Sequence, residues 1–139
     1  MQDCIFCKIV QGEIPSEKIM GDETAYAFMD IRPLAEGHVL LIPRQHYETL
    51  DEVDATTSGK LLSHLPALVR AVQSATGCQG VNILQNNGRV AHQEIPHVHF
   101  HIIPRNPGDA FQFNWPAGEY PQDRMRQLAA AIRDTLQSG

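Results

Sequence analysis

The chain has 139 residues, of which 42% are hydrophobic and 19% charged, and this is the size and composition of one globular domain. Its formal net charge of -5 argues against a nucleic-acid backbone as the main partner, because proteins that bind one usually present a basic face. A small anionic ligand is compatible with this charge, since one pocket can be positive on an acidic protein. We therefore expect a single domain over residues 1–139 and no nucleic-acid partner.

The sequence carries no signal for membrane insertion or export. Its apolar runs fall short of the roughly 18 residues that a membrane span requires, so we expect no membrane partner. The N-terminal residues Met1 to Cys4 lack the basic-then-apolar pattern of a signal peptide. Both observations lead us to expect a cytoplasmic protein.

The first predicted elements are short. Residues 4–11 favour a helix, and residues 18–30 favour two strands joined by a turn at Gly21-Asp22. Residues 37–44 read GHVLLIPR, an apolar and β-rich run that predicts a central strand.

The middle of the chain is predicted to be helical. Leucine and valine recur at helical spacing over residues 56–76. Pro66 lies inside this pattern and predicts a kink or a break into two helices, because proline lacks the N–H that a helix interior needs. Gly77 is the predicted end of this segment.

The last predicted elements are two strands and a helix. Residues 81–85 and 97–104 favour strands, and residues 121–137 favour an amphipathic helix. The order of strands, helix, strands and helix indicates an α+β domain built on an antiparallel sheet.

The most informative segment is the predicted strand that begins HVHFHII. Side chains alternate across a strand, so His97, His99 and His101 share one face, and the apolar residues between them share the other. A histidine-rich surface strand is the plainest interpretation. Two functional ones compete with it: three ligands of one catalytic zinc ion, or a division into one metal ligand, one nucleophile and one donor to the substrate. The rest of the sequence favours the division.

A metal site is also indicated near the N-terminus. Cys4 and Cys7 form a C-x-x-C pair, and in a reducing compartment such a pair favours metal or redox chemistry over a disulfide. His46 and His97 are the candidates for two further ligands. Two cysteines and two histidines would close a structural zinc site. The alternative is that the cysteines are simply buried apolar residues.

Several ordered motifs give the sequence a wider resemblance. The strand motif HVHFHII, with apolar residues between the histidines, resembles that of the histidine triad family of nucleotide-binding proteins. Further matches lie at Cys4–Val10, Ala27–Pro33, Gly37-His38 and Ile42–His46, and at Asn86 and Gln93. The opening segment is similar to the zinc-bearing branch of that family.

The resemblance implies a fold and an activity. The fold is an antiparallel five-stranded sheet with two main helices, and two copies join their sheets into a ten-stranded sheet in a homodimer. The activity is the release of a nucleoside monophosphate, with AMP or another purine nucleotide as the expected product, from an amine, acyl or phosphate leaving group. It runs through a nucleotidyl-histidine intermediate.

The resemblance also implies residue roles. His99 attacks the α-phosphorus, His101 and His38 lie beside the phosphate, and Asp30 holds the ribose hydroxyls. The base is walled by Ile5, Phe6, Phe28 and Ile31, although Phe28 and Ile31 fit a plain core equally well. Asn86 and Gln93 lie on the phosphate side. The structural zinc is held by Cys4, Cys7, His46 and His97. Trp115 either packs locally or reaches the active site of a second copy.

Three residues depart from the family pattern. His92 stands where glycine is usual, Glu94 stands where one branch has serine or threonine, and Arg44 replaces the commoner lysine. A carboxylate near phosphate would not assist the leaving group as a hydroxyl does, so these departures affect the preferred leaving group. Two other functions stay open beside this one: a zinc hydrolase with a tris-histidine metal, and a nucleotide sensor with vestigial catalysis.

Overall fold

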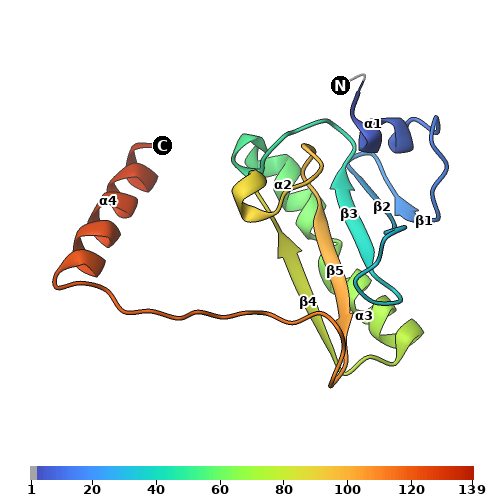
Figure 1. Ribbon diagram of the computed structural model, residues 1–139. Helices are drawn as coiled ribbons and strands as arrows, with labels where there is room; N and C mark the ends of the chain where they lie inside the picture. The colour runs from blue at the N-terminus through green and yellow to red at the C-terminus, as the bar shows by residue number, and fades with distance from the viewer. Residues whose placement is uncertain (1–2) are drawn as a thin grey trace.

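The computed structural model describes residues 3–139, so Met1 and Gln2, part of the segment examined for a signal peptide, lie outside the described residues. Five strands form one antiparallel sheet in the order β1-β2-β3-β5-β4 (Figure 1). The strands are β1 (Lys18–Gly21), β2 (Ala25–Met29), β3 (Val39–Pro43), β4 (Gly80–Gln85) and β5 (Phe100–Arg105). The predicted antiparallel α+β fold is therefore confirmed.

Over residues 3–139 the structure also contains four α-helices and two single 3-10 turns. The helices are α1 (Ile5–Val10), α2 (Ala55–Leu62), α3 (Leu65–Thr76) and α4 (Arg124–Ser138), and the turns are η1 (Leu50–Glu52) and η2 (Arg89–Ala91). Over the described residues, none of these helices is long and apolar enough to span a bilayer.

The predicted helical segment is broken in two, as the position of Pro66 indicated. Pro66 lies in the first turn of α3, where its missing N–H has no intrahelical partner to lose. Gly77 ends α3 with φ of 67°, a left-handed conformation that glycine adopts without steric cost. Both expectations are confirmed.

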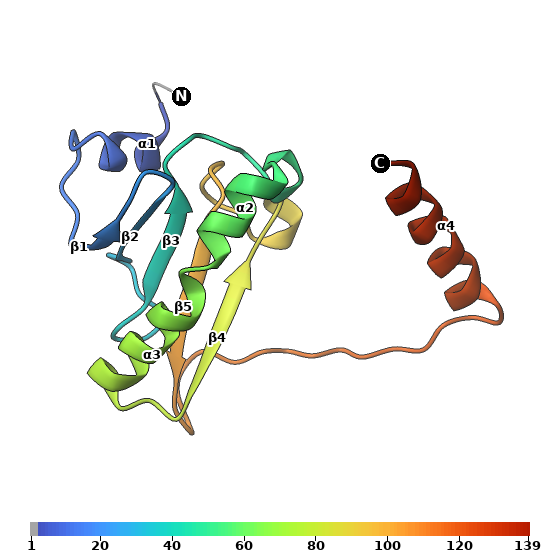
Figure 2. The same cartoon turned by 180° about the vertical axis from the view of Figure 1, so that it is seen from behind.

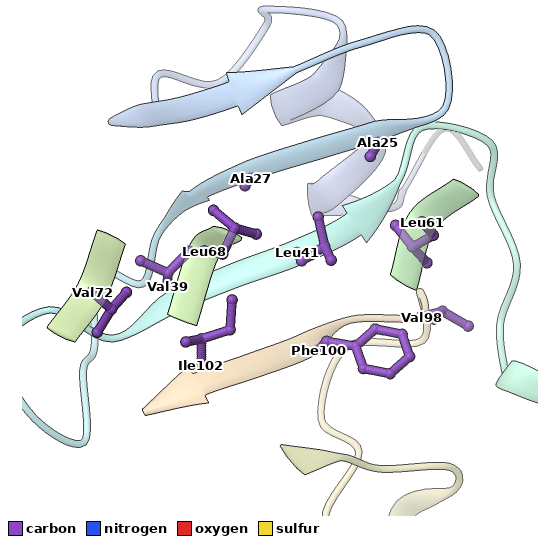
Figure 3. Packing of buried hydrophobic residues seen from close by; sticks show 10 residues of the cluster. All are labelled: Ala25, Ala27, Val39, Leu41, Leu61, Leu68, Val72, Val98, Phe100 and Ile102. Carbon is purple, nitrogen blue, oxygen red and sulfur yellow. The ribbon is translucent and has the colours of Figure 1, made fainter. Parts of the chain in front are cut away.

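One face of the sheet is covered by α2 and α3 (Figure 2). Alternate residues of β2, β3 and β5 point to this face and meet three apolar residues of the helices (Figure 3). The cluster comprises Ala25, Ala27, Val39, Leu41, Leu61, Leu68, Val72, Val98, Phe100 and Ile102. Because the strands alternate, this core directs the histidines of the triad to the opposite face.

The opposite face is covered at one end by α1. Phe6, Cys7 and Ile9 of α1 pack against Phe28 and Leu40 in a second, smaller core. This packing places the C-x-x-C segment beside the histidine face of the sheet, although the two lie about 90 residues apart in the chain.

The prediction that all three histidines lie in one strand is wrong in its boundaries. The strand β5 begins at Phe100, so only His101 belongs to it. His97 and His99 precede the residues that pair in the sheet, because the last pair between β3 and β5 is Leu41↔Phe100. The Val98 N–H instead donates to the Tyr47 carbonyl at 2.8 Å. Alternation persists through this extended segment, so the predicted faces are correct.

The helix α4 lies away from the sheet, at the end of an extended linker (Figures 1 and 2). Within α4 no residue is buried, and its apolar side chains Met125, Ile132 and Leu136 are exposed. The predicted amphipathic helix is present, but no residue of its apolar face is buried against another part of residues 3–139.

Candidate active site

The His99 ring is buried and held in one tautomer. Its Nδ1 atom lies 2.7 Å from the His97 carbonyl oxygen. A carbonyl only accepts, so Nδ1 carries the proton and Nε2 keeps a free lone pair. The Phe6 ring packs edge-on against the imidazole at 5.2 Å between centroids. His99 is thus a fixed imidazole with a nucleophilic nitrogen.

His101 is oriented through a chain of two hydrogen bonds. The backbone N–H of Leu34 donates to His38 Nδ1 at 3.0 Å, so neutral His38 carries its proton on Nε2. That Nε2–H donates to His101 Nδ1 at 2.9 Å. His101 therefore carries its own proton on Nε2. His99 therefore offers a free lone pair and His101 offers an N–H donor. The centroids of the two rings lie 4.9 Å apart.

Burial keeps these histidines neutral. It is the largest cause that lowers the pKa of His99, against a hydrogen bond to His97 and the charges of Asp30 and Glu94. Burial, followed by the charges of His99 and His38, lowers the pKa of His101 to about 4. A neutral imidazole is the form that can attack phosphorus.

Asp30 lies next to His38 at the end of β2. Its Oδ2 is 3.6 Å from His38 Nε2, and its Oδ1 accepts the Arg32 N–H at 2.8 Å. Asp30, His38 and His101 could share a metal ion on distance alone. The tautomer argues against it, because His38 Nε2 carries a proton and its Nδ1 is occupied by Leu34. Asp30 is therefore a carboxylate at the edge of the histidine face and not a metal ligand.

The four residues predicted to wall a base differ in exposure. Phe6 and Phe28 are buried and pack edge to face at 5.5 Å between centroids. Ile5 is 42% exposed and Ile31 is 87% exposed. The structure thus brings Phe6 against His97 and His99, with Phe28 packed on Phe6, and leaves the two isoleucines exposed at the surface.

The two residues predicted on the phosphate side have different surroundings. The Gln93 side chain is buried, donates to the Glu48 carbonyl and accepts the Gly88 N–H, both at 2.7 Å. The Asn86 amide donates to the His92 carbonyl at 3.4 Å. Gln93 therefore organises the loop before the triad through its own hydrogen bonds.

The four predicted metal ligands form one cluster. Their ligand atoms all lie within 4.8 Å of one another. His97 Nδ1 is 3.3 Å from Cys4 Sγ and 3.6 Å from Cys7 Sγ, and His46 Nδ1 is 3.4 Å from Cys7 Sγ. Tetrahedral zinc with ordinary bond lengths separates sulfur and nitrogen ligands by about 3.5 Å. The donor set and its spacing fit such an ion.

The surroundings of this cluster also suit a metal. His97 Nε2 lies 2.9 Å from the Pro43 carbonyl, which fixes the proton there and leaves Nδ1 free to coordinate. Burial, then a hydrogen bond and charge from Cys4, raises the pKa of Cys7 to about 11. A cation is needed to hold such a buried thiol as thiolate.

Sequence reasoning missed the backbone groups that set these tautomers. The Leu34 N–H and the Pro43 carbonyl contribute no side-chain pattern, so no sequence signal identifies them. It also missed Arg89, whose turn η2 brings it beside His92 and Glu94 in a pocket.

The comparisons identify the family. The family model of the HIT domain matches residues 11–108, and the chain belongs to this family. The resemblance carried by the histidine motif is therefore confirmed.

Named relatives include two enzymes. Adenosine 5'-monophosphoramidase HNT1 of Candida albicans is 38% identical over 138 residues, covering 96% of this chain and 91% of the relative. Adenylylsulfatase HINT3 of Arabidopsis thaliana is 43% identical over 107 residues, covering 77% of this chain and 54% of the relative.

Solved structures share the fold. SMU.412c from Streptococcus mutans has a TM-score of 0.93 at 40% identity, covering 98% of this chain and 87% of that one. A Zn-bound histidine triad family protein from Mycobacterium smegmatis has a TM-score of 0.74 at 31% identity, covering 99% of both chains.

Proposed function

We propose that this protein is a hydrolase that releases AMP from an adenosine 5'-phosphoramidate or a related conjugate, with His99 as the nucleophile. The observation that carries the proposal is the hydrogen bond from His99 Nδ1 to the His97 carbonyl at 2.7 Å. This hydrogen bond leaves the Nε2 lone pair of the buried imidazole free and stabilises the cation that forms when this ring attacks. The enzymes named among the relatives support AMP as the released nucleotide.

The reaction has two steps. First, a bond forms between His99 Nε2 and the α-phosphorus, the bond from phosphorus to the leaving group breaks, and the leaving atom takes up a proton from solvent. Second, water attacks phosphorus, the phosphorus–nitrogen bond to His99 breaks, and AMP leaves while the water proton passes to solvent. His101 Nε2–H donates to a phosphoryl oxygen in both steps and stabilises the charge that develops there.

The nucleoside end of the substrate is assigned to the face beside α1. Phe6 and Phe28, with the exposed Ile5 and Ile31, offer apolar surface to a purine base. Asp30 accepts from the ribose hydroxyls. Asn86 and Gln93 lie in the loop before the triad and are assigned to the phosphate side.

The metal is zinc in a structural role. Cys4, Cys7, His46 and His97 form a closed set of four ligands with no position left for substrate. When bound, zinc ties α1 to the segment that carries His99 and adds to the free energy of folding.

The active form is a homodimer. In the described part of the chain β4 pairs only with β5, so its outer edge is free to continue the sheet into a second copy. The apolar side chains of α4 and the exposed Trp115 are further surface that a second copy can cover. Trp115 is 80% exposed, which fits a reach toward the neighbouring active site better than local packing.

The test is AMP release from a fluorogenic adenosine phosphoramidate. We expect His99→Ala to abolish release, and His64→Ala, which changes a histidine outside the site, to leave it unchanged. Brief chelation is expected to spare activity. Loss on chelation with recovery on adding zinc would support a catalytic metal instead. Tight AMP binding by the wild-type protein without turnover would support a nucleotide sensor.

A further inference from the structure

The Gln93 side chain is only 5% exposed, and both of its N–H donors bind main-chain carbonyls. Its Nε2 atom donates one proton to the Glu48 carbonyl at 2.7 Å and the other to the Ile95 carbonyl at 3.2 Å. Its Oε1 atom accepts the Gly88 N–H at 2.7 Å. A glutamine amide has only two N–H donors, so Gln93 has none left for a phosphoryl oxygen.

The Ile95 carbonyl also closes the turn that leads into the triad. It accepts the His97 N–H at 2.8 Å, a hydrogen bond across two residues that defines a γ-turn centred on Pro96. Proline suits the central position of such a turn, because its ring fixes φ at about −65°. The Gln93 amide therefore binds the same oxygen that fixes the direction in which the chain enters His97.

The Glu48 carbonyl connects this amide to a second segment beside the triad. Glu48 follows Tyr47, whose carbonyl accepts the Val98 N–H at 2.8 Å. Gln93 thus links two main-chain segments that hold His97 from both sides. One segment forms the turn before His97, and the other binds the residue that follows it.

The peptide group between His97 and Val98 orients the nucleophile. Its N–H is the one that Tyr47 binds, and its carbonyl accepts the His99 Nδ1–H at 2.7 Å. A rotation of this peptide group would move the carbonyl away from Nδ1 and remove the preference for that tautomer. Gln93 therefore reaches His99 through hydrogen bonds of the main chain and needs no contact with the substrate.

We propose that Gln93 is a positioning residue for the nucleophile: its amide holds the His97 peptide group on which His99 is oriented, and it does not donate to the phosphate. This inference rests on the proposed function and deepens it, because Gln93 lies on the phosphate side of the site. A direct phosphate donor would act only once the substrate is bound, whereas a positioning residue acts before any ligand binds. The ligand-free protein therefore separates the two roles.

The first measurement reads the tautomer of His99 in ligand-free protein that carries nitrogen-15 in its histidines. The ring nitrogens of a pure Nδ1–H tautomer give two widely separated NMR signals, and exchange between tautomers averages them. The signals of His99 are assigned by their absence from His99→Ala. We expect the wild-type protein to show the pure Nδ1–H form, and Gln93→Ala to show averaged signals at the same pH.

The second measurement is steady-state release of AMP from the fluorogenic adenosine phosphoramidate. We expect Gln93→Ala to lower kcat by about 100-fold, the effect of a misplaced reacting group, with little change in KM. Pro96→Ala relaxes the same turn from an exposed position, so it is expected to change the His99 signals and kcat in the same direction but less. Gln85→Ala is the matched control and is expected to change neither, because the Gln85 amide bonds locally, to Asn86 and Asn87.

Averaged His99 signals in the wild-type protein, or unaveraged signals in both Gln93→Ala and Pro96→Ala, would overturn this inference. A raised KM in Gln93→Ala with unchanged His99 signals would identify Gln93 as a direct ligand of the phosphate instead. Circular dichroism checks the fold of Gln93→Ala, and Pro96→Ala carries the same test if that variant does not fold. Absence of His99-dependent AMP release by the wild-type protein would overturn the proposed function, whereas the spectra of the ligand-free protein would still decide this inference.

Discussion

The Nε2 atom of His38 lies 2.9 Å from the Nδ1 atom of His101, a contact between residues 63 positions apart in the chain. The proton in it belongs to His38, because the Leu34 N–H occupies the other nitrogen of that ring. A main-chain amide thus decides, through one imidazole, which nitrogen of a second imidazole carries the proton. Among the described residues no fully buried side-chain nitrogen or oxygen lacks a hydrogen-bond partner.

We expect His38→Ala to lower kcat by about 100-fold, because His101 loses the donor that fixes its tautomer and one oriented donor to the phosphate is lost. The effect on KM is expected to be small, since the contact acts through His101. Steady-state kinetics on the fluorogenic adenosine phosphoramidate gives both kcat and KM, with His64→Ala as the control. If kcat stays within twofold of the wild-type value, His38 does not position His101.

The alternation of residues 97–103 was enough to predict that the three histidines lie on the face opposite the main core, because the period of an extended chain is fixed by its geometry. The boundary of β5 was not predictable in the same way, since it depends on where β3 ends, and that is a matter of pairing between distant segments. The separation of α4 from the sheet was also not predictable. The spacing of apolar residues in α4 indicates that the helix has an apolar face, but it does not indicate what covers that face.

The donors of the candidate metal cluster were predictable because cysteine and histidine are themselves the signal. The main-chain groups that set the tautomers of the histidines were not predictable. The Leu34 N–H and the Pro43 carbonyl are main-chain atoms, and every residue except proline has both kinds. Their roles follow only from the fold that brings them to the rings of His38 and His97.

We expect Cys7→Ser to remove the bound metal and to lower the melting temperature, because the remaining donors cannot complete a tetrahedral site that contributes to folding. Cys78→Ser is the matched control, since Cys78 is also free but lies outside the cluster. Elemental analysis gives the metal content, and calorimetry gives the melting temperature. Equal metal content in both variants would show that Cys7 is not a ligand.

Acid is expected to destabilise the protein through His101. Burial lowers the pKa of His101 in the folded chain to about 4, from an ordinary value of 6.5. The unfolded chain therefore takes up the proton first, so the contribution of this residue is full above pH 6.5 and is lost as the pH falls toward about 4.

The comparison is between wild-type protein and His101→Gln, whose side chain does not titrate. Urea unfolding at several values between pH 7.5 and pH 4.5 gives the free energy of unfolding of each. The wild-type protein is expected to lose more stability over this range. Both proteins keep the Cys–His cluster, so acid release of metal affects them alike. Parallel curves would contradict the lowered pKa.

His92 adopts a left-handed conformation with φ of 71°, at the end of η2. Such a conformation costs an L-residue roughly 1–2 kcal/mol, and glycine adopts it freely at a smaller cost in chain entropy. His92→Gly is therefore expected to raise the free energy of unfolding by about 1 kcal/mol. His92→Ala loses the same ring but keeps the backbone cost, so the difference between the two variants isolates the strain. Urea unfolding measures it. If glycine is no more stabilising than alanine, the loop is not strained. If His92→Gly is more stable and its leaving-group preference changes, the histidine is retained for the pocket and not for the fold.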